Sequence, residues 1–350
     1  MKVCFRVDSS QGMGSGHLMR CLTLAEALRK CGAQIHFICR DHKGNLTDLL
    51  RQKSIPVTVL PVMSFNLTTG RTDNAQTIDA NESIESFSGE IPDWLALDHY
   101  SLGIEWEQQV HPYVKHLMVI DDYPNRLHDC DLLLDQNYSQ DGDERYAQFV
   151  PETCNLLLGP QYALLRNEFS SMREALKPRN HQLKKVLVFF TAGNDQGETL
   201  KAMKGLELFG EAENVDVVVG QSNPDNPEII RKCNELHWGY HCQVDYMPNL
   251  IAEADLVIGG GGSSNWERCS LGVPSMVTIL AENQAPITEA LGRAGIIDNL
   301  GWNTALQPSD YAKALKSITN QHLAEMSQKA FKLVDGKGAE RLAAILLDKK

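Results

Sequence analysis

A histidine follows a run of glycines near the start of the chain, in the segment GMGSGHLMR at 12–20. Glycine permits positive φ and a close approach of the backbone to a ligand, and the free N–H groups of a helix start attract anions. A neutral imidazole at such a position can act as a general base. We therefore interpret His17 as a catalytic base, and Gly14, Gly16 and Arg20 as contacts to its substrate. The alternative is a histidine that only caps or packs a helix.

A second glycine-rich segment, ADLVIGGGGSSNWER at 254–268, has the pattern of a strand, a tight turn and a helix start. Backbone without side chains, followed by two serines at a helix start, can cradle a diphosphate. Glu267 falls in the first helical turn, where its carboxylate can accept two hydrogen bonds from a ribose diol. The segment thus predicts a nucleotide site. The alternatives are a flexible turn for the glycines and a helix-dipole interaction for Glu267.

Neither glycine segment has the spacing of a common cofactor motif. The first lacks the G-x-G-x-x-G of a dinucleotide site and the G-K-[ST] of a P-loop, which disfavours NAD and ATP. The acidic runs at 121–122 and 129–131 do not supply the converging oxygens that a hard cation requires. His237 and His241 are separated by a glycine, and no third ligand follows. We expect no metal and no cofactor.

Apolar runs of strand length alternate with amphipathic stretches of helix length, which predicts βαβ units and parallel sheets. In the first half the predicted strands are 2–7, 34–39, 94–98, 116–120, 131–134 and 155–158, with a helix at 17–31. In the second half the predicted strands are 186–190, 215–219, 256–259 and 276–279, and the predicted helices are 166–176, 198–209, 227–235, 266–271, 284–292, 321–334 and 339–347.

Several predicted strands of the first half end in polar residues, at 98–100, 121–122 and 135–137. Ligands of open α/β sheets bind beyond the carboxyl ends of the strands. We therefore expect Asp98, Tyr100 and Asp121 to contact the substrate or to orient His17. Ordinary polarity of loops at strand ends is the alternative.

The 350 residues exceed the usual size of one α/β core, so two domains are expected. We predict an α/β protein of two Rossmann-like, doubly wound domains facing each other across a cleft. The predicted boundaries are 1–160 for the first domain, 161–184 for a connecting segment and 185–350 for the second domain.

The formal net charge of -12 disfavours nucleic acid and anionic membranes as partners. The nine cysteines are odd in number and show no C-x-x-C spacing, which is typical of a reducing compartment. The N-terminus has no signal-peptide pattern, and the longest apolar runs, such as Val186–Phe190, are far too short to span a membrane. We expect a cytoplasmic protein.

The two glycine segments together resemble a known family. The pattern G-x-G-H-x-x-R at the first junction and G-G-S-x-x-x-E-R-x-x-x-G-x-P at the second are similar to those of PseG, the hydrolase family of pseudaminic acid biosynthesis. The family is related to SpsG and to the MurG-like GT-B glycosyltransferases. Further matching positions are Asp98-His99-Tyr100, Ile120-Asp121-Asp122, Asp135-Gln136-Asn137 and Gly159-Pro160 with Leu164-Leu165-Arg166.

The resemblance implies a GT-B fold and hydrolysis of UDP-2,4-diacetamido-2,4,6-trideoxy-β-L-altropyranose to free sugar and UDP. His17 would activate a water that attacks the anomeric carbon with inversion, and other enzymes of the same pathway are possible partners. The implied UDP contacts are Asn194, Tyr246, Met247, Gly261, Gly262, Ser263, Ser264, Asn265 and Glu267. The loop at 191–195 departs from the family pattern, because it has Thr-Ala-Gly-Asn-Asp where the family usually has Gly-Gly-x-Asp.

Two other functions use the same site. A GT-B glycosyltransferase would bind the same UDP-sugar and pass the sugar to an acceptor. A non-catalytic subunit would bind the nucleotide without turnover, although a binding module has no need for a base at position 17.

Overall fold

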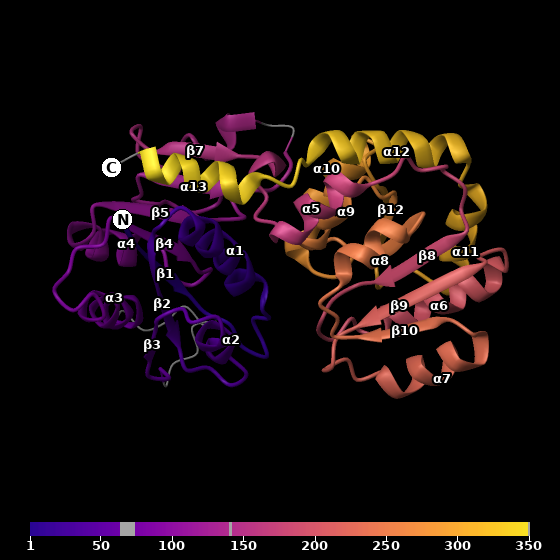
Figure 1. Cartoon of the computed structure of the whole chain (residues 1–350), viewed down its shortest axis with the longest axis horizontal. Helices are drawn as coiled ribbons and strands as arrows, with labels where there is room; N and C mark the ends of the chain where they lie inside the picture. The colour runs from indigo at the N-terminus through magenta and orange to yellow at the C-terminus, as the bar shows by residue number, and fades with distance from the viewer. Residues whose placement is uncertain (64–73, 140–141, 349–350) are drawn as a thin grey trace. The chain divides into compact units, whose positions relative to one another are not determined.

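Two parallel β-sheets organise the described residues, which are 1–63, 74–139 and 142–348 of a computed structural model. Contacts between Cα atoms divide the chain into two units. Unit 1 comprises Met1–Leu164 and Lys337–Lys350, and unit 2 comprises Leu165–Gly336. Each unit has its own sheet with helices on both faces (Figure 1). This is the fold class that the sequence predicts.

In unit 1 the described strands form a seven-stranded sheet in the order β3-β2-β1-β4-β5-β6-β7. The strands are β1 Lys2–Val7, β2 Gln34–Arg40, β3 Val57–Leu60, β4 Trp94–Asp98, β5 His116–Ile120, β6 Leu132–Asp135 and β7 Asn155–Leu158. The helices are α1 Gly16–Lys30, α2 Thr47–Gln52, α3 Ala75–Glu85, α4 Ile104–Val110 and α13 Gly338–Asp348, with 3-10 turns η2 His111–Tyr113, η3 Gly142–Tyr146 and η4 Pro160–Tyr162.

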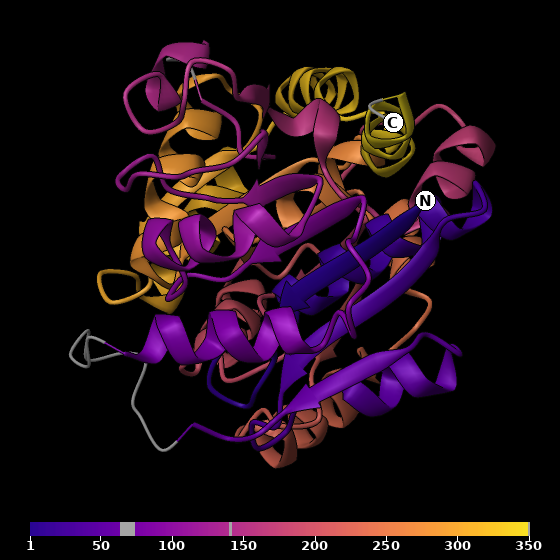
Figure 2. The same cartoon turned by 90° about the vertical axis from the view of Figure 1, so that its left-hand side faces the viewer.

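The central strands of this sheet are buried on both faces, as parallel strands covered by helices must be. Side chains of β1 alternate between two apolar cores: Val3 and Phe5 pack with α1 and α13, whereas Cys4 packs with α3 and α4. Figures 1 and 2 show α3 and α4 on the opposite face of the sheet from α1 and α13. Packing on both faces therefore fixes the orientation of β1, and with it the position of the first glycine turn, which follows β1.

A buried ion network lies at the carboxyl end of β1. Arg6 donates to both Asp8 Oδ1 (2.6 Å) and Asp79 Oδ2 (2.7 Å), and Arg40 donates to Asp79 and to Glu82 Oε2 (2.8 Å). Asp8 also accepts a hydrogen bond from the backbone N–H of Arg40 (2.7 Å). Buried charges are tolerated only when they are paired in this way. The network ties β1, β2 and α3 together directly beneath the glycine turn.

The last helix, α13, belongs to unit 1, although the sequence analysis extends the second domain from 185 to 350. Leu342, Ala343 and Leu346 of α13 are buried in the same core as α1. The indole Nε1 of Trp94 donates to the Leu346 carbonyl oxygen at 3.1 Å. The sequence predicts a helix here but not the sheet that it covers, because an apolar helix face can pack against the core of either unit.

In unit 2 the described strands form a six-stranded sheet in the order β10-β9-β8-β11-β12-β13. The strands are β8 Lys185–Phe189, β9 Asn214–Val219, β10 Gly239–Cys242, β11 Leu256–Gly260, β12 Ser275–Ile279 and β13 Asp298–Trp302. The helices are α5 Asn167–Ala175, α6 Glu198–Phe209, α7 Asn226–Leu236, α8 Met247–Glu253, α9 Ser264–Ser270, α10 Ala285–Arg293, α11 Pro308–Ser317 and α12 Asn320–Leu333, with the 3-10 turn η5 Glu282–Gln284.

Each predicted strand and helix has a counterpart whose ends lie within two residues of the prediction. The sequence missed β3, β10 and β13, which are edge strands with partly exposed side chains. An edge strand lacks the continuous apolar run of a central strand, so its pattern is weak. Within the described ranges, no helix combines the length and the apolar character needed to cross a membrane.

In each sheet, the strands that follow the first strand of the unit are added on one side of it at first, and later strands are added on its other side. The two neighbours at this switch point are β1 and β4 in unit 1, and β8 and β11 in unit 2. The crevice at the carboxyl ends of such strands is where doubly wound sheets bind ligands. In unit 1 these ends carry the first glycine turn and Asp98, and in unit 2 they carry the loop at 191–195 and the second glycine turn.

Candidate functional site

The turn between β1 and α1 sets the position of His17. Gly14 has a φ of 77°, a conformation that favours glycine, and its N–H donates to the Ser10 carbonyl oxygen at 2.9 Å. The helix starts at Gly16, so His17 lies in its first turn. A Cβ atom added to Gly14 or Gly16 would meet nothing within 4 Å. The turn is therefore open on the side of its glycines.

The side chain of His17 is fixed by a carboxylate from the neighbouring strand. Its Nδ1 lies 2.6 Å from Asp98 Oδ1, and its ring meets the Tyr100 ring edge to face at 4.6 Å between centroids. A carboxylate accepts hydrogen bonds, so Nδ1 carries the proton and Nε2 of the neutral ring keeps its lone pair. The His17 side chain is 13% exposed. The geometry is that of an imidazole prepared to accept a proton at Nε2.

Arg20 lies one turn further along α1 and holds the same carboxylate. It donates to Asp98 Oδ2 through Nε (2.6 Å) and to Asp98 Oδ1 through Nη2 (2.7 Å). Burial alone would raise the pKa of Asp98, but the charge of Arg20 and the hydrogen bonds from Arg20 and His17 outweigh it and hold that pKa well below its usual range. Asp98 is therefore ionised and can keep the His17 ring in one tautomer and one orientation.

Asp122 completes this network. It accepts from Arg20 Nη1 (2.9 Å), from the Tyr100 hydroxyl (2.8 Å) and from Asn137 Nδ2 (3.0 Å). Burial and the nearby Asp122 charge raise the pKa of Tyr100, so its hydroxyl stays a donor. Asp122 and Asn137 are absent from the predicted site residues, although both belong to the polar strand ends that could have indicated them.

Asp121 does not orient His17 in the structure, and its contact with the substrate stays a prediction. It is buried, and its carboxylate contacts Arg126 Nη2 (3.1 Å), His128 Nε2 (3.4 Å) and the Tyr146 hydroxyl (3.4 Å) instead of His17. Successive residues at a strand end point in opposite directions, so only one of two adjacent aspartates can join the His17 network. Asp122 is the one that does.

The turn after β11 depends on glycine for its packing. A Cβ on Gly259 would lie 2.3 Å from the Phe189 carbonyl oxygen, and one on Gly261 would lie 2.3 Å from Thr288 Oγ1. The side-chain oxygen of Gln284 accepts from the N–H groups of Gly261 (3.2 Å) and Leu280 (3.0 Å). Gln284 thus supports the turn from behind, a role that the sequence alone does not reveal.

Asn265 has a supporting position as well. It is buried, its Nδ2 donates to the Gly261 carbonyl oxygen (3.0 Å), and its Oδ1 accepts from Arg268. Arg268 also donates to the Gly260 carbonyl oxygen at 3.0 Å. The sequence analysis names Asn265 as a diphosphate ligand, whereas its side chain in the structure holds the turn. Ser263 is exposed and Ser264 and Gly262 are half-buried, so these remain available to a ligand.

Glu267 is half-buried in the first turn of α9 and, within the described residues, its carboxylate makes no hydrogen bond or ion pair. Burial raises its pKa, against the opposing charges of Arg166 and Arg268. A half-buried carboxylate without a partner is costly. Two hydroxyl donors from a ligand would remove that cost.

The other predicted nucleotide contacts lie on two further loops of unit 2. Tyr246 is exposed, and its hydroxyl lies 3.1 Å from His241 Nδ1, while Met247 is buried at the start of α8. Asn194 is exposed, and its Oδ1 accepts from the Gln196 N–H at 2.8 Å. The side chain of Asp195 accepts a hydrogen bond from the N–H of Thr199, in the first turn of α6, at 3.2 Å.

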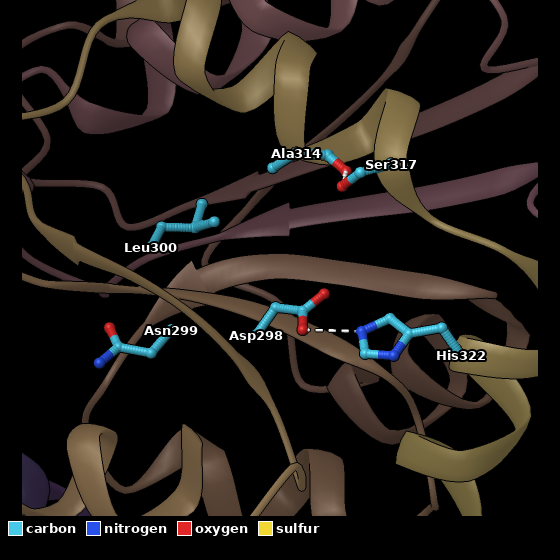
Figure 3. A pocket seen from close by; sticks show the side chains of 6 residues that line it. All are labelled: Asp298, Asn299, Leu300, Ala314, Ser317 and His322. Atoms are coloured by element: carbon cyan, nitrogen blue, oxygen red, sulfur yellow. Dashed lines mark hydrogen bonds and ion pairs between the residues drawn. The ribbon is translucent and has the colours of Figure 1, made fainter. Parts of the chain in front are cut away.

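Two cavities differ in their relation to these groups. One of about 370 Å³ in unit 1 adjoins the His17 network through Tyr100. Another of about 470 Å³ in unit 2 is lined by Asp298, Asn299, Leu300, Ala314, Ser317 and His322 (Figure 3). Figure 3 shows His322 directed at Asp298, with Nε2 to Oδ1 at 2.8 Å. Asp298 starts β13, so this cavity lies at the amino ends of the strands, opposite the glycine turn.

Comparison with solved structures defines the class of fold. The chain is similar to MurG of Acinetobacter baumannii, with a TM-score of 0.70, 12% identity and 99% of each chain covered. It is also similar to UDP-GlcNAc 2-epimerase from Neisseria meningitidis bound to UDP-GlcNAc, with a TM-score of 0.61, 12% identity, and 99% of this chain and 100% of that chain covered. The protein therefore has a GT-B fold.

Comparison with curated sequences gives distant relatives. The chain is 28% identical over 300 residues to the UDP-2,4-diacetamido-2,4,6-trideoxy-beta-L-altropyranose hydrolase of Campylobacter jejuni, covering 84% of this chain and 97% of the relative. It is 26% identical over 217 residues to the spore coat polysaccharide biosynthesis protein SpsG of Bacillus subtilis, covering 59% of this chain and 62% of SpsG. No protein-family model matches the chain.

Proposed function

We propose that the protein hydrolyses a UDP-linked sugar to free sugar and UDP, and that the sugar is a 2,4-diacetamido-2,4,6-trideoxyhexose. The observation that carries the proposal is the pairing of His17 Nδ1 with Asp98 at 2.6 Å, which leaves Nε2 as a proton acceptor. The distant similarity to the Campylobacter jejuni hydrolase supports the reaction type and the sugar class. A protein that only binds nucleotide has no use for such an oriented base.

In the proposed reaction, His17 Nε2 takes a proton from a water molecule, and the water oxygen attacks the anomeric carbon of the sugar. The bond from that carbon to the UDP oxygen breaks on the opposite face, so the configuration inverts. Asp98 stabilises the imidazolium that forms and holds its orientation, as a carboxylate partner does for a catalytic histidine. Holding the water molecule in line with the anomeric carbon would further increase the rate of the reaction.

Unit 2 would hold the UDP group. The diphosphate would bind to the backbone of the turn at 261–264 and to the hydroxyls of Ser263 and Ser264. The ribose hydroxyls would donate hydrogen bonds to the carboxylate of Glu267. Tyr246, Met247 and Asn194 remain candidate contacts to the uridine side of the substrate. Donors aimed at the leaving diphosphate would stabilise its developing charge.

The test is product analysis by NMR over a panel of UDP- and GDP-linked deoxyamino sugars, without any acceptor. We expect UDP and free sugar of inverted configuration from the diacetamido substrate. The His17→Ala variant should lose about 10²–10⁴-fold in kcat and should bind UDP as the unmodified protein does. The matched variant His322→Gln, which alters a histidine at the other end of the unit 2 strands, should keep full activity. Full turnover by His17→Ala would refute the proposal.

The GT-B fold also favours a second candidate, a glycosyltransferase that uses the same UDP-sugar. A transferase would release sugar only slowly without its acceptor and would form a new glycosidic bond when the acceptor is added. The same NMR assay separates the two functions, because a hydrolase places the oxygen of water on the anomeric carbon.

A further inference from the structure

We propose that Cys130 and Cys154 form a modification site, a dithiol that a small-molecule disulfide such as glutathione disulfide converts to an intramolecular disulfide bond. The two sulfur atoms lie 3.7 Å apart, although the residues are 24 positions apart in the chain. The spacing in the sequence gives no sign of this pair, which only the fold brings together. The proposal is independent of the proposed hydrolase function.

The backbone holds the two cysteines side by side. Cys130 lies just before β6 and Cys154 just before β7, and these strands pair in parallel with Leu132 opposite Asn155. The N–H of Asn155, next to Cys154, donates to the carbonyl oxygen of Asp131, next to Cys130, at 2.9 Å. The register thus places Cys154 opposite Asp131, one residue from Cys130. The two sulfur atoms must close from 3.7 Å to about 2.05 Å when the bond forms.

The two thiols differ in a way that suits stepwise exchange. Cys154 is partly exposed, whereas Cys130 is buried at 2% exposure. The contact between the two thiols lowers the pKa of Cys154, and the same contact together with burial raises the pKa of Cys130. The thiolate is the attacking species in thiol–disulfide exchange. Cys154 is therefore the thiol that reacts first, and Cys130 is the one that resolves the intermediate.

The reaction has two steps. The Cys154 thiolate attacks one sulfur of glutathione disulfide, which forms a mixed disulfide and releases one glutathione thiolate. The Cys130 sulfur then attacks the Cys154 sulfur, loses its proton and releases the second glutathione. Two protein thiols are oxidised by two electrons, one glutathione disulfide is reduced, and the two thiol protons end on the two glutathione molecules.

The experiment equilibrates the full-length protein with glutathione disulfide, blocks the remaining thiols by alkylation and maps the peptides by mass spectrometry. We expect a cross-linked peptide pair that joins Cys130 to Cys154. Cys31 and Cys242, which are exposed, serve as internal controls and should carry glutathione or the alkyl group. The cross-link should persist in the Cys31→Ser/Cys242→Ser double variant.

Two results would overturn the proposal. One is a mixed disulfide at Cys154 that persists at equilibrium while Cys130 remains a free thiol. The other is alkylation of both residues after the exposed thiols have reacted fully. In the Cys154→Ser variant, Cys130 should remain unmodified by glutathione, because burial closes it to direct attack, and a glutathione adduct on Cys130 in that variant would contradict the assigned order of reaction.

Discussion

At the scale of single residues, the chemistry proposed for unit 1 depends on one buried carboxylate. Asp98 is the acceptor for His17 Nδ1 and for two donors of Arg20. An imidazole bound in this way has a fixed tautomer, and a guanidinium neutralises the carboxylate charge behind it. The residue types are common at strand ends, so their meaning comes from the three contacts that converge on one side chain.

The Asp98→Asn variant tests this dependence. An amide presents an N–H₂ group where His17 and Arg20 need acceptors, so the imidazole should lose its fixed tautomer. We expect kcat for UDP-sugar hydrolysis to fall about 10²–10⁴-fold, with UDP affinity changed much less. Asp93→Asn is the matched control, since Asp93 lies just before the amino end of the same strand and pairs with Lys115. Equal losses in both variants would contradict the assigned role.

His128 predicts a pH dependence of stability. Burial opposes its charge, but hydrogen bonds to Asp121 and Glu107 outweigh burial and raise its pKa to about 9. The folded protein thus keeps this proton above the ordinary histidine pKa of about 6.5. The contribution to the free energy of unfolding is complete below pH 6.5 and is lost as the pH rises through 9, by about 3 kcal/mol.

Denaturant unfolding of the unmodified protein and of His128→Gln, measured from pH 6 to pH 9.5, tests this expectation. The difference in free energy between the two should shrink as the pH rises. Burial raises the pKa of Asp135 to about 7. Asp135 therefore changes the free energy of unfolding at lower pH, between the pKa of an aspartate in the unfolded chain and pH 7. Both proteins contain Asp135, so its effect cancels in the difference between them. Parallel curves above pH 7 would show that His128 does not supply the dependence.

At the scale of elements, each candidate site contains a glycine-rich turn at the carboxyl end of a parallel strand. The turn after β11 donates a hydrogen bond to the side chain of Gln284 and accepts one from the side chain of Asn265, and Thr288 packs against Gly261. A side chain added at a tightly packed glycine of this turn would therefore clash with these residues. A side chain added at a glycine with open space around it would make few contacts.

Gly261→Ala and Gly262→Ala form a matched pair for this element. A Cβ at Gly261 would lie 2.3 Å from Thr288 Oγ1, whereas a Cβ at Gly262 would meet only Gln284 Nε2 at 3.9 Å. We expect Gly261→Ala to lower the free energy of unfolding by about 1–3 kcal/mol through overpacking. Gly262→Ala should change it by less than about 0.5 kcal/mol. Denaturant titration of both variants measures the difference, and equal effects would contradict the packing described for the turn.

At the scale of the whole molecule, unit 1 is discontinuous in sequence. Its sheet is complete by Leu158, but helix α13 comes from the last residues of the chain and covers the same face as α1. The first core therefore cannot be closed until α13, which follows all of unit 2 in the sequence, has been synthesised. A fragment that ends near residue 164 would expose the apolar surface that α13 covers.

Leu342→Ala tests this dependence of unit 1 on the end of the chain. Leu342 is fully buried in the core with α1, whereas Leu347 on the same helix is only half-buried. We expect Leu342→Ala to lower the free energy of unfolding by about 2–5 kcal/mol, and Leu347→Ala by less than about 1 kcal/mol. Unfolding should be followed by tryptophan fluorescence, because Trp94 donates to Leu346 of this helix. Similar losses in both variants would be inconsistent with the burial of Leu342.

The sequence alone determined the central strands, most of the helices and the two glycine turns, because buried parallel strands are continuous apolar runs and glycine marks the tight turns between them. It also indicated His17, Asp98 and Glu267, since polar residues at strand ends and helix starts are visible in the pattern. It did not show the edge strands β3, β10 and β13, whose exposed side chains weaken the apolar signal.

Only the tertiary structure decided which residues meet. It selected Asp122 over Asp121 for the His17 network, gave Asn265 a supporting role in the turn, and placed α13 on unit 1. It also brought together Cys130 and Cys154 across paired strands. The physical reason is that side-chain direction and contacts between distant segments depend on strand register and on packing, and neither is encoded in local spacing.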